Sequence, residues 1–345
     1  MRATPSIDVV IPVYNAPALT RRCIDSVVTF LGESIGNIYV QDDASGAETR
    51  EMLDQLPYER VHVYHAQTNR GFGASVNEAV KRSNAFCVLV LNSDTTVNQN
   101  FLPLLCAALA ADPQLAVVIP AGNDYARHDM DQYLRRPGGY IATHRLQGHA
   151  FLVRREVFQE AGGFDPAYGR GYYEDVDLGR RLDQRGFRLG VHPDARIQHK
   201  GGGSFGRGRS FRQLVRGNRN LYFSRYPDAR RNILLLSDNF PLAHFPAPLV
   251  DALEDVFRKG GYVHWLSPEP ARQLLCLQMR SYAMSIGTIM RLLMRSWRED
   301  KHITEVWMLP DVSRLVRALI VFWARIQSVK VLSWESKTGN SPESV

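Results

Sequence analysis

The chain has 345 residues, of which 45% are hydrophobic and 10% aromatic. This length exceeds that of one typical domain, and this composition excludes an intrinsically disordered chain. The formal net charge of +7 favours anionic partners without choosing among nucleotides, phospholipids and nucleic acids.

Strand and helix patterns alternate over the first ninety residues. Runs rich in β-branched and apolar residues predict strands over residues 7–13, 38–41, 61–65 and 86–91. Helices are expected from Pro17, from Ser45, whose spacing to Glu48 fits a capping box, and through Asn77. This order is typical of a doubly wound α/β domain with a mostly parallel sheet.

A polar cluster follows each of these strands. The clusters are Tyr14-Asn15, Asp42-Asp43, Asn69-Arg70-Gly71 and Asn92-Ser93-Asp94. Because ligands bind at the carboxyl ends of the strands in such sheets, we expect all four clusters along one edge. Each alone also has an ordinary interpretation, as turn chemistry or, for Asp94, as the N-cap of a following helix.

The densest group of carboxylates lies further along the chain. A segment rich in glycine and tyrosine leads to Glu174, Asp175 and Asp177, which open a predicted helix. These acids suit the positive end of a helix dipole. Their crowding also raises the proton affinity of at least one carboxylate by like-charge repulsion. We therefore interpret Asp175 as a general base.

The segments around this helix are less regular. Residues 121–147, which include Arg127, are expected to form loops near the substrate. Strands are predicted over residues 148–153, 188–192 and 195–199. His149 is either a structural histidine or a contact to the acceptor, and His199 stands before a glycine run, where it is either packed or a ligand.

Six motifs in this order resemble those of glycosyltransferase family 2, including its bacterial rhamnosyltransferase-like members: VVIPVYN, QDDAS, NRGFGASVN, LNSD, GGFD and YYEDVDL. The resemblance covers roughly residues 6–225. It implies a GT-A fold and an inverting sugar transfer in cell-surface or cell-wall glycan biosynthesis. The donor would be a nucleotide-diphosphate sugar, of UDP or dTDP above all, and the acceptor a saccharide that is expected to be lipid-linked.

The resemblance also implies roles for single residues. Asp175 matches the catalytic base, with Glu174 beside it, and Asn92-Ser93-Asp94 stands in the place of the D-x-D metal motif. Asp94 and His199 would then hold Mg²⁺ or Mn²⁺, and the imidazole favours Mn²⁺. The nucleotide-sugar would contact Pro12, Tyr14, Asn15, Asp42, Asn69, Gly71, Asn77, Asn92 and Ser93.

A second, accessory domain with a Rossmann-like α/β pattern is predicted over residues 229–334, followed by a disordered tail over 335–345. We expect strands over 232–236, 261–265 and 304–309, and helices over 247–259, up to Trp297, and over 312–332. Arg314, Arg317 and Arg325 fall on one face of the last helix, which fits a membrane surface or ordinary packing.

Eight arginines between residues 207 and 231 form either a solvated basic helix or a surface for pyrophosphate or anionic lipid. The Q-x-x-R-W motif of processive synthases is missing, which favours the addition of one or a few sugars. The four cysteines form no C-x-x-C pair, and neither a signal peptide nor a spanning helix is found. We therefore expect a cytoplasmic protein, with the inner face of the membrane as a further, peripheral location.

Rival functions remain at this point. A catalytically inactive nucleotide-sugar-binding or scaffold protein would keep the pocket without the reaction. A nucleotidyltransferase would need a basic phosphate-binding loop, which VYNAPALT does not offer. Nucleic acid is not an expected partner, because no recognition module is found.

Overall fold

The computed structural model describes residues 6–126, 128–201, 208–238, 241–296, 302–334 and 343–344. Contacts divide the chain into two compact units, residues 1–129 with 135–222, and residues 130–134 with 223–345. Arg127, Arg207 and residues 202–204 of the glycine run, all singled out from the sequence, lie outside the described residues.

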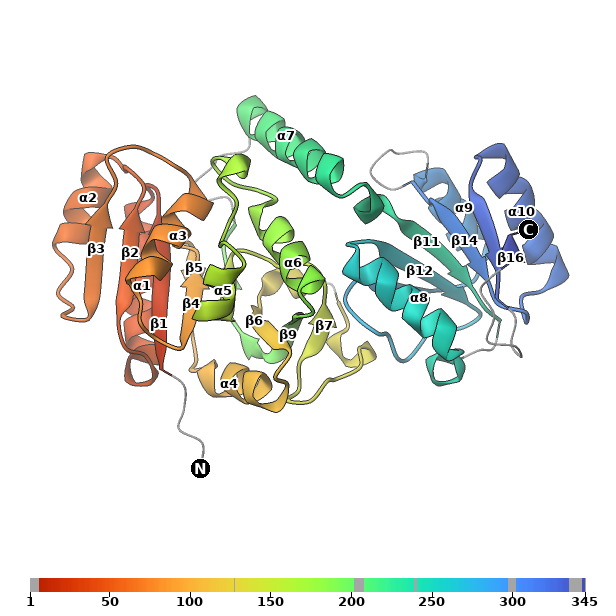
Figure 1. The fold of residues 1–345 in the computed structure, drawn as a ribbon, viewed down its shortest axis with the longest axis horizontal. Helices are drawn as coiled ribbons and strands as arrows, with labels where there is room; N and C mark the ends of the chain where they lie inside the picture. Colours follow the sequence, from red (N-terminus) through yellow and green to blue (C-terminus); the bar gives the residue numbers. More distant parts are fainter. Residues whose placement is uncertain are drawn as a thin grey trace. The chain divides into compact units, whose positions relative to one another are not determined.

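The first unit is built on an eight-stranded sheet with the order β3-β2-β1-β4-β8-β6-β9-β7 (Figure 1). Strands β1 to β4 pair in parallel, as do β6 and β9, whereas β8 runs antiparallel between β4 and β6, and β7 antiparallel at the edge. The sheet is therefore mostly parallel. Its strands are β1 Ile7–Val13, β2 Ile38–Asp42, β3 Val61–His65, β4 Cys87–Leu91, β6 Leu115–Ala121, β7 Ile141–Thr143, β8 Ala150–Arg154 and β9 Arg188–Arg196.

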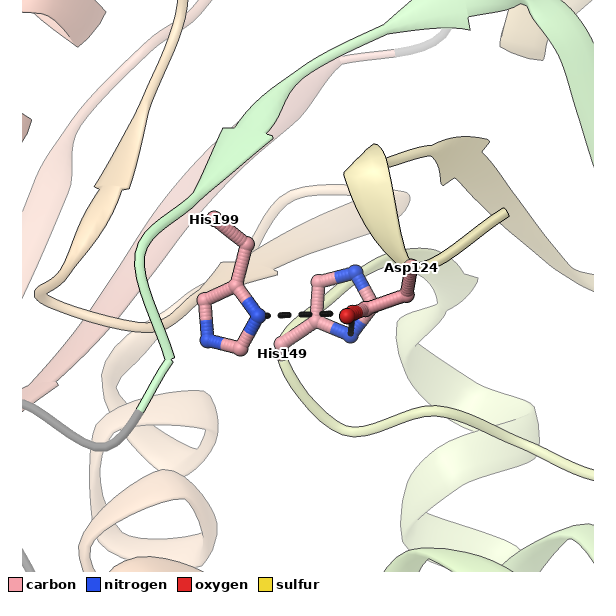
Figure 2. A group of neighbouring side chains, drawn as sticks. All are labelled: Asp124, His149 and His199. Carbon is pink, nitrogen blue, oxygen red and sulfur yellow. Dashed lines mark hydrogen bonds and ion pairs between the residues drawn. The ribbon is translucent and has the colours of Figure 1, made fainter. Parts of the chain in front are cut away.

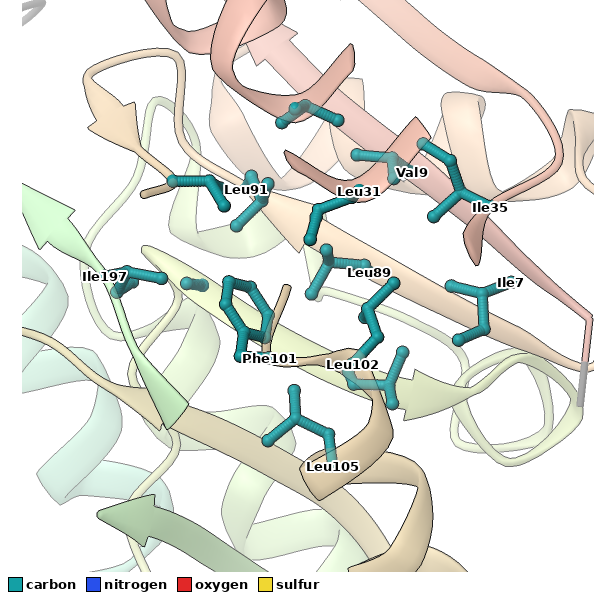
Figure 3. Close-up of a cluster of buried hydrophobic side chains, with 14 of the residues drawn as sticks. Ile7, Val9, Leu31, Ile35, Leu89, Leu91, Phe101, Leu102, Leu105 and Ile197 are labelled. Carbon is teal, nitrogen blue, oxygen red and sulfur yellow. The ribbon is translucent and has the colours of Figure 1, made fainter. Parts of the chain in front are cut away.

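Helices cover this sheet because its central strands are apolar on both faces. Every residue of β1 and of β4 is buried. On one face, Leu31 of helix α1, Leu89 of β4 and Leu105 of helix α4 belong to one apolar cluster (Figure 3). The helices of this unit are α1 Pro17–Leu31, α2 Ala47–Asp54, α3 Phe72–Arg82, α4 Leu102–Ala111, α5 Arg155–Glu160, α6 Glu174–Gln184 and α7 Arg209–Arg225.

A two-stranded ribbon joins distant parts of the first unit. Strand β5, Thr95–Thr96, pairs antiparallel with β10, Gln198–His199, and places His199 opposite Thr95. Asp94 precedes this ribbon and α4 begins only at Leu102, so the interpretation of Asp94 as a helix N-cap is wrong.

The capping box at Ser45 is also wrong. Helix α2 begins at Ala47, and its N-cap, Gly46, makes no side-chain cap bond. The Ser45 hydroxyl instead accepts a hydrogen bond from the Asn15 N–H at 2.7 Å, and the Asn15 carbonyl oxygen Oδ1 accepts one from the Gly46 N–H at 2.9 Å. These bonds tie the loop after β1 to the loop after β2.

The second unit contains a smaller sheet with the order β13-β12-β11-β14-β15-β16, parallel except for β16. The long helix predicted up to Trp297 is too long, because strand β13 occupies part of that segment and helix α9 begins only at Ile286. Trp297 itself lies outside the described residues. The predicted helix over 312–332 ends at Ile326, and a strand follows it. The elements are β11 Asn232–Leu236, α8 Ala247–Arg258, β12 Tyr262–Ser267, β13 Met279–Ala283, α9 Ile286–Arg295, β14 Glu305–Met308, α10 Arg314–Ile326, β15 Lys330–Ser333 and β16 Glu343–Ser344.

The second unit bears on two predictions, one for Arg231 and one for the tail of the chain. Arg231 pairs with Glu305 at 2.8 Å and with Asp255 at 3.5 Å, so this arginine is part of the second unit's own structure and not of an anion-binding surface. Within the predicted tail, residues 343–344 pair with β15, and residues 335–342 and 345 lie outside the described part. Among the described residues, no helix has the length and apolar character that crossing a bilayer requires.

Candidate active site

A cavity of about 480 Å³ opens at the carboxyl ends of the central strands of the first unit. The segments that follow β1, β2, β3 and β4 all contribute to its lining, as do the start of α6 and strand β10. The residues singled out from the sequence that line it are Pro12, Tyr14, Asp43, Asn69, Gly71, Asn92, Ser93, Asp94, His149, Glu174, Asp175 and His199.

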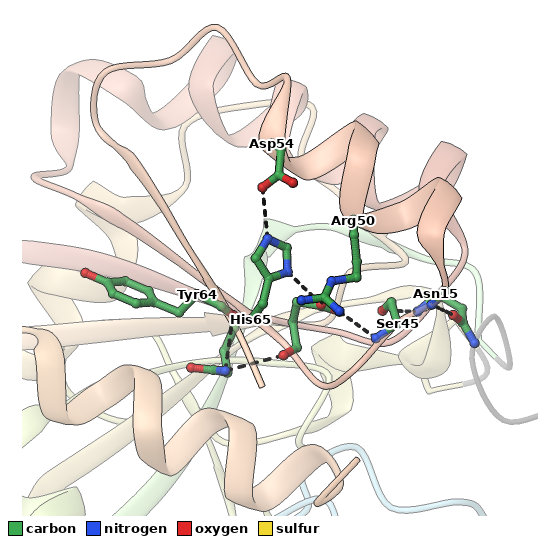
Figure 4. A network of polar contacts seen from close by, with 9 residues as sticks. Asn15, Ser45, Arg50, Asp54, Tyr64 and His65 are labelled. Carbon is green, nitrogen blue, oxygen red and sulfur yellow. Dashed lines mark hydrogen bonds and ion pairs between the residues drawn. The ribbon is translucent and has the colours of Figure 1, made fainter. Parts of the chain in front are cut away.

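Asp42 is not among the lining residues, although the sequence favoured it as a contact to base or ribose. Its side chain is fully buried, and its carboxylate contacts His65 Nδ1 at 2.8 Å and the Ser45 N–H at 3.0 Å (Figure 4). The neighbouring Asp43 lines the cavity instead and accepts hydrogen bonds from the backbone N–H groups of Arg70 and Gly71. Asp42 therefore stabilises the end of β2, while Asp43 holds the loop after β3.

Asn15 and Asn77 are not lining residues either. Asn15 is exposed and bonds Ser45 and Gly46. The Asn77 amide donates to the Phe164 carbonyl at 2.8 Å and accepts from the Phe164 N–H at 2.9 Å. Asn77 thus fixes the turn that leads to α6, and neither Asn15 nor Asn77 lines this cavity.

Gly71 occupies a position that only glycine fits. Its φ is +94°, and an added Cβ would stand 2.5 Å from the Gly169 carbonyl oxygen and from the Arg170 Cα. The loop after β3 therefore packs directly against the loop that precedes α6, and both line the cavity.

His199 bridges two carboxylates at one end of the cavity. Its Nε2 lies 3.2 Å from Asp94. Its Nδ1 lies 3.4 Å from Asp124, and its ring stacks on that of His149 with centroids 4.6 Å apart (Figure 2). The Asn123 amide bonds both the N–H and the carbonyl of His199 at 2.9 Å. The short ribbon of β5 and β10 and this clamp bring together residues about a hundred positions apart.

The pKa values of the two stacked histidines are shifted in opposite directions. Burial would lower the pKa of His199, but its bonds to Asp124 and Asp94 outweigh that effect and raise the pKa to about 9. Burial lowers the pKa of His149 to about 4, and the charge of His199 adds to the effect. Near neutral pH, without a metal, His199 is a cation between two carboxylates and His149 is neutral.

This cluster fits a divalent cation. Asp124, His149 and His199 offer ligand atoms that all lie within 4.8 Å of one another, and Asp94 contacts His199. His149 Nε2 is buried without a hydrogen-bond partner, and its Nδ1 lies 3.7 Å from Asp124. Mixed imidazole and carboxylate donors suit Mn²⁺ better than Mg²⁺. The sequence indicated neither Asp124 nor His149 as ligands, since no periodic pattern marks that stretch.

Glu174 and Asp175 begin helix α6 and line the same cavity. The Asp175 carboxylate accepts hydrogen bonds from the N–H groups of Gly148 and Val176, both at 2.8 Å. Burial raises the pKa of Asp175, opposed by Arg145 and by these N–H groups. Burial, and then the charge of Asp175, raises the pKa of Glu174 well above its ordinary value. Burial is thus the first cause, and the repulsion inferred from the sequence is the second.

Asp177, the third acid of this group, lies outside the cavity lining. Its carboxylate pairs with Arg181 at 2.7 Å and accepts a hydrogen bond from the Tyr168 hydroxyl at 3.2 Å. It anchors α6 to the preceding loop.

The entry to α6 is held in an unusual backbone conformation. Tyr172 and Tyr173 have φ values of +73° and +74°, which non-glycine residues adopt at some cost. The buried Asn218 of α7 donates from its amide to the carbonyls of Tyr168 and Gly171 at 2.7 Å and lies 3.0 Å from that of Tyr172. The sequence did not indicate Asn218, which compensates for the conformation of this loop.

We expect Glu174→Gln to stabilise the protein in a pH-dependent way. A carboxyl with a raised pKa in the folded state contributes full stability below its unfolded pKa and loses it as pH rises through its folded pKa. The variant removes that loss, so its thermal midpoint should match that of the wild type near pH 4.5 and exceed it by about 3 °C at pH 8. Differential scanning fluorimetry across this range measures the difference.

Glu78→Gln is the matched control. A hydrogen bond from Lys81 lowers the pKa of Glu78, so this variant should lose stability at pH 8, the opposite sign. A midpoint difference for Glu174→Gln that does not change with pH would contradict the raised pKa.

Several polar atoms of the cavity have unused hydrogen-bonding capacity. Among the described residues, the buried side-chain atoms without a hydrogen-bond partner that belong to cavity-lining residues are Asn69 Oδ1, Asn92 Oδ1, Gln147 Oε1, His149 Nε2 and Glu174 Oε2. Native proteins rarely leave such atoms unsatisfied unless a ligand, an ion or water completes them. Their convergence on one cavity marks it as a binding site for a polar ligand.

Known proteins resemble the part of the chain that builds this cavity. The family model described as glycosyl transferase family 2 matches residues 8–162. The chain is 25% identical over 228 residues to the O-antigen biosynthesis protein RfbC of Myxococcus xanthus, covering 58% of this chain and 18% of that protein. It is 43% identical over 72 residues to an N-acetylglucosaminyl-diphospho-decaprenol L-rhamnosyltransferase of Mycobacterium tuberculosis, covering 21% of this chain and 22% of that protein.

Among solved structures, the mannosyltransferase PcManGT from Pyrobaculum calidifontis, in complex with GDP-Man and Mn²⁺, superposes with a TM-score of 0.51. The identity is 19%, and the match covers 65% of this chain and 64% of that one, so it bears on the fold alone. The chain spans less than half the length of the curated relatives it matches. Residues 8–162 of the first unit therefore match the model of glycosyltransferase family 2, and this unit has the GT-A fold.

Proposed function

We propose that the protein transfers a sugar from a nucleotide-diphosphate sugar to a saccharide acceptor, with inversion at the anomeric carbon. One observation carries this proposal: unpartnered buried polar atoms, an acidic pair and a histidine–carboxylate cluster all border one cavity at the carboxyl edge of the sheet. An inert scaffold would have no need of a buried, unpaired Glu174 beside Asp175.

Asp175 is the proposed general base. Its carboxylate would take the proton of the acceptor hydroxyl while that oxygen forms a bond to C1 of the sugar and the bond from C1 to the leaving phosphate oxygen breaks on the opposite face. The raised pKa of Glu174 favours its neutral form, which leaves a single negative charge on the pair. Gly148 N–H orients Asp175 by its hydrogen bond.

The histidine–carboxylate cluster is the proposed metal site. Asp94, Asp124, His149 and His199 would hold a divalent cation, which supplies positive charge for the diphosphate that leaves. Asn69, Asn92 and Ser93, which line the same cavity, would bond the nucleotide and sugar hydroxyls. Tyr14 and Pro12, at the end of β1, would contact the base.

The donor and acceptor classes are proposed from the relatives. The Mycobacterium protein is named for transfer of L-rhamnose to a decaprenol-linked N-acetylglucosamine, and the Myxococcus protein for O-antigen biosynthesis. We therefore propose a lipid-linked saccharide as acceptor, in the assembly of a cell-surface glycan. For the donor we propose a UDP or dTDP sugar, which the sequence motifs favour and the names of these relatives leave open.

Thermal shift with nucleotides tests the proposal. UDP, dTDP, GDP and CMP are each added with Mn²⁺, with Mg²⁺ and with a chelator. One nucleotide should raise the midpoint of the first unit by about 5–10 °C at a hundredfold excess over its dissociation constant, and only with metal. A folded protein that responds to none of them would instead support the scaffold function.

A further inference from the structure

The second unit exposes an apolar surface on two of its helices. Chain connections in this sheet run in two directions: β11 to β12 towards one edge, and β13 to β14 and β14 to β15 towards the other. Because parallel crossovers are right-handed, α8 covers one face, and α9 and α10 lie side by side on the other. Figure 1 shows α8 in front of this sheet.

The inner sides of α9 and α10 form a normal core. Leu292 and Leu293 of α9, and Ile320 and Ala324 of α10, pack with buried residues of β11 and β14. The inner face of each helix is therefore covered by the sheet, and this packing holds both helices in place.

The outer sides of the same helices are apolar as well. The exposed positions recur every three or four residues, so they form one stripe on each helix. Seven of the eleven exposed large hydrophobic side chains among the described residues lie here: Ile286 (83% exposed), Met290 (52%), Met294 (62%), Leu315 (73%), Leu319 (56%), Phe322 (67%) and Ile326 (63%).

Positive charge accompanies these stripes without any acid. Neither α9 nor α10 contains Asp or Glu, and exposed arginines at positions 291, 314 and 325 flank the stripes. Helix α8, on the other face, carries Asp251, Glu254 and Asp255 and exposes no large hydrophobic side chain. The two faces of this sheet therefore carry different surfaces. The face covered by α8 is polar, as in an ordinary soluble domain, whereas the face covered by α9 and α10 is apolar and basic.

We propose that the outer face of α9 and α10 docks on an anionic lipid bilayer, with the apolar stripes in the interfacial layer and the arginines against lipid phosphates. Helices that combine an apolar face with arginine bind membrane surfaces in this way. A second copy fits less well, because two such faces brought together would oppose arginine to arginine across the contact. A nucleic acid would leave the apolar stripes uncovered.

Docking would place the protein where lipid-linked saccharides are found. This consequence rests on the proposed function, whereas the docking itself does not. Membrane binding is therefore measured without donor or acceptor, and its failure would leave the nucleotide and metal results untouched.

Co-sedimentation of the full chain with vesicles tests the docking. We expect binding to vesicles of one part phosphatidylglycerol to three parts phosphatidylcholine, and about tenfold weaker binding to phosphatidylcholine alone. Phe322→Glu should weaken binding to the anionic vesicles by about tenfold, since it removes an inserted ring and adds a negative charge. Unchanged thermal midpoints would show that the variant is folded.

Phe86→Glu is the matched control, since Phe86 is also exposed, at 56%, and lies in the first unit. It makes the same change of size and charge, and it should bind as the wild type does. Arg314→Gln with Arg325→Gln should reduce anionic binding several-fold without changing the midpoint. Equal binding by Phe322→Glu and Phe86→Glu would overturn the proposal. So would a wild-type dimer in light scattering that Phe322→Glu converts to a monomer, because a second copy would then cover this face.

Discussion

Asp175→Asn is expected to lower sugar transfer by about 10²–10⁴-fold, the usual contribution of a general base, while nucleotide binding stays within about twofold of the wild type. The amide keeps the size of the side chain, but it cannot take the acceptor proton. Once the thermal shift has identified the donor nucleotide, product formation and calorimetric nucleotide binding are measured on the same preparation. Loss of both in a folded protein would remove Asp175 from the role of base.

Asp177→Asn is the control for this prediction. Asp177 is a buried carboxylate two residues further along α6, but it pairs with Arg181 and lies outside the cavity lining. The variant should lose stability and keep the turnover of its folded fraction. A similar loss of turnover would show that any buried acid of α6 affects the rate through the fold alone.

The pH dependence of kcat/KM tests the role of Asp175 independently. Burial raises the pKa of Asp175 above that of an ordinary aspartate, so the acidic limb of kcat/KM should lie above the pH range in which free aspartate titrates. Arg145 opposes this shift, and Arg145→Gln should therefore move the limb to still higher pH.

Asp94→Ala is expected to abolish the metal-dependent part of nucleotide binding, with a loss of affinity of at least about tenfold. The carboxylate contacts His199 and lines the cavity, so its removal takes away both a ligand and the group that orients the imidazole. Calorimetric titration of Mn²⁺ in the presence of the nucleotide measures the effect. An unchanged metal response would refute the role of Asp94.

Asp194→Ala serves as its control, because it removes an exposed carboxylate of β9 outside the cavity lining and changes the net charge equally. Wild-type Mn²⁺ affinity should also rise with pH. The pKa of His199 is about 9, so below that value the metal must displace a proton, at a cost approaching tenfold for each pH unit.

The strands and the acidic helix were determined by the sequence. The predicted bounds of β1 and β3 are those of the structure, since a strand in a parallel sheet reads as a short apolar run that ends at polar turn residues. Glu174 and Asp175 open α6 as predicted, because acids in the first turn stabilise the positive end of a helix. Such patterns are local, and a single chain is enough to read them.

The choice between Asp42 and Asp43, and the partners of His199, were decided only by the tertiary structure. Asp42 ends β2 and Asp43 follows it, but only the packing of the loop after β3 decides which carboxylate lines the cavity. Asp124 and His149 meet His199 because a two-residue ribbon and one asparagine clamp join distant segments.

In the second unit, the sequence likewise could not predict which side of α9 and α10 is exposed. Local periodicity places apolar and basic residues around a helix, but it does not say which side a sheet will cover. The helical crossovers of that sheet decide it, and they leave Leu319 and Phe322 outside while Ile320 and Ala324 are buried. Contacts between residues far apart in the chain carry no local signal, so the sequence alone could not assign them.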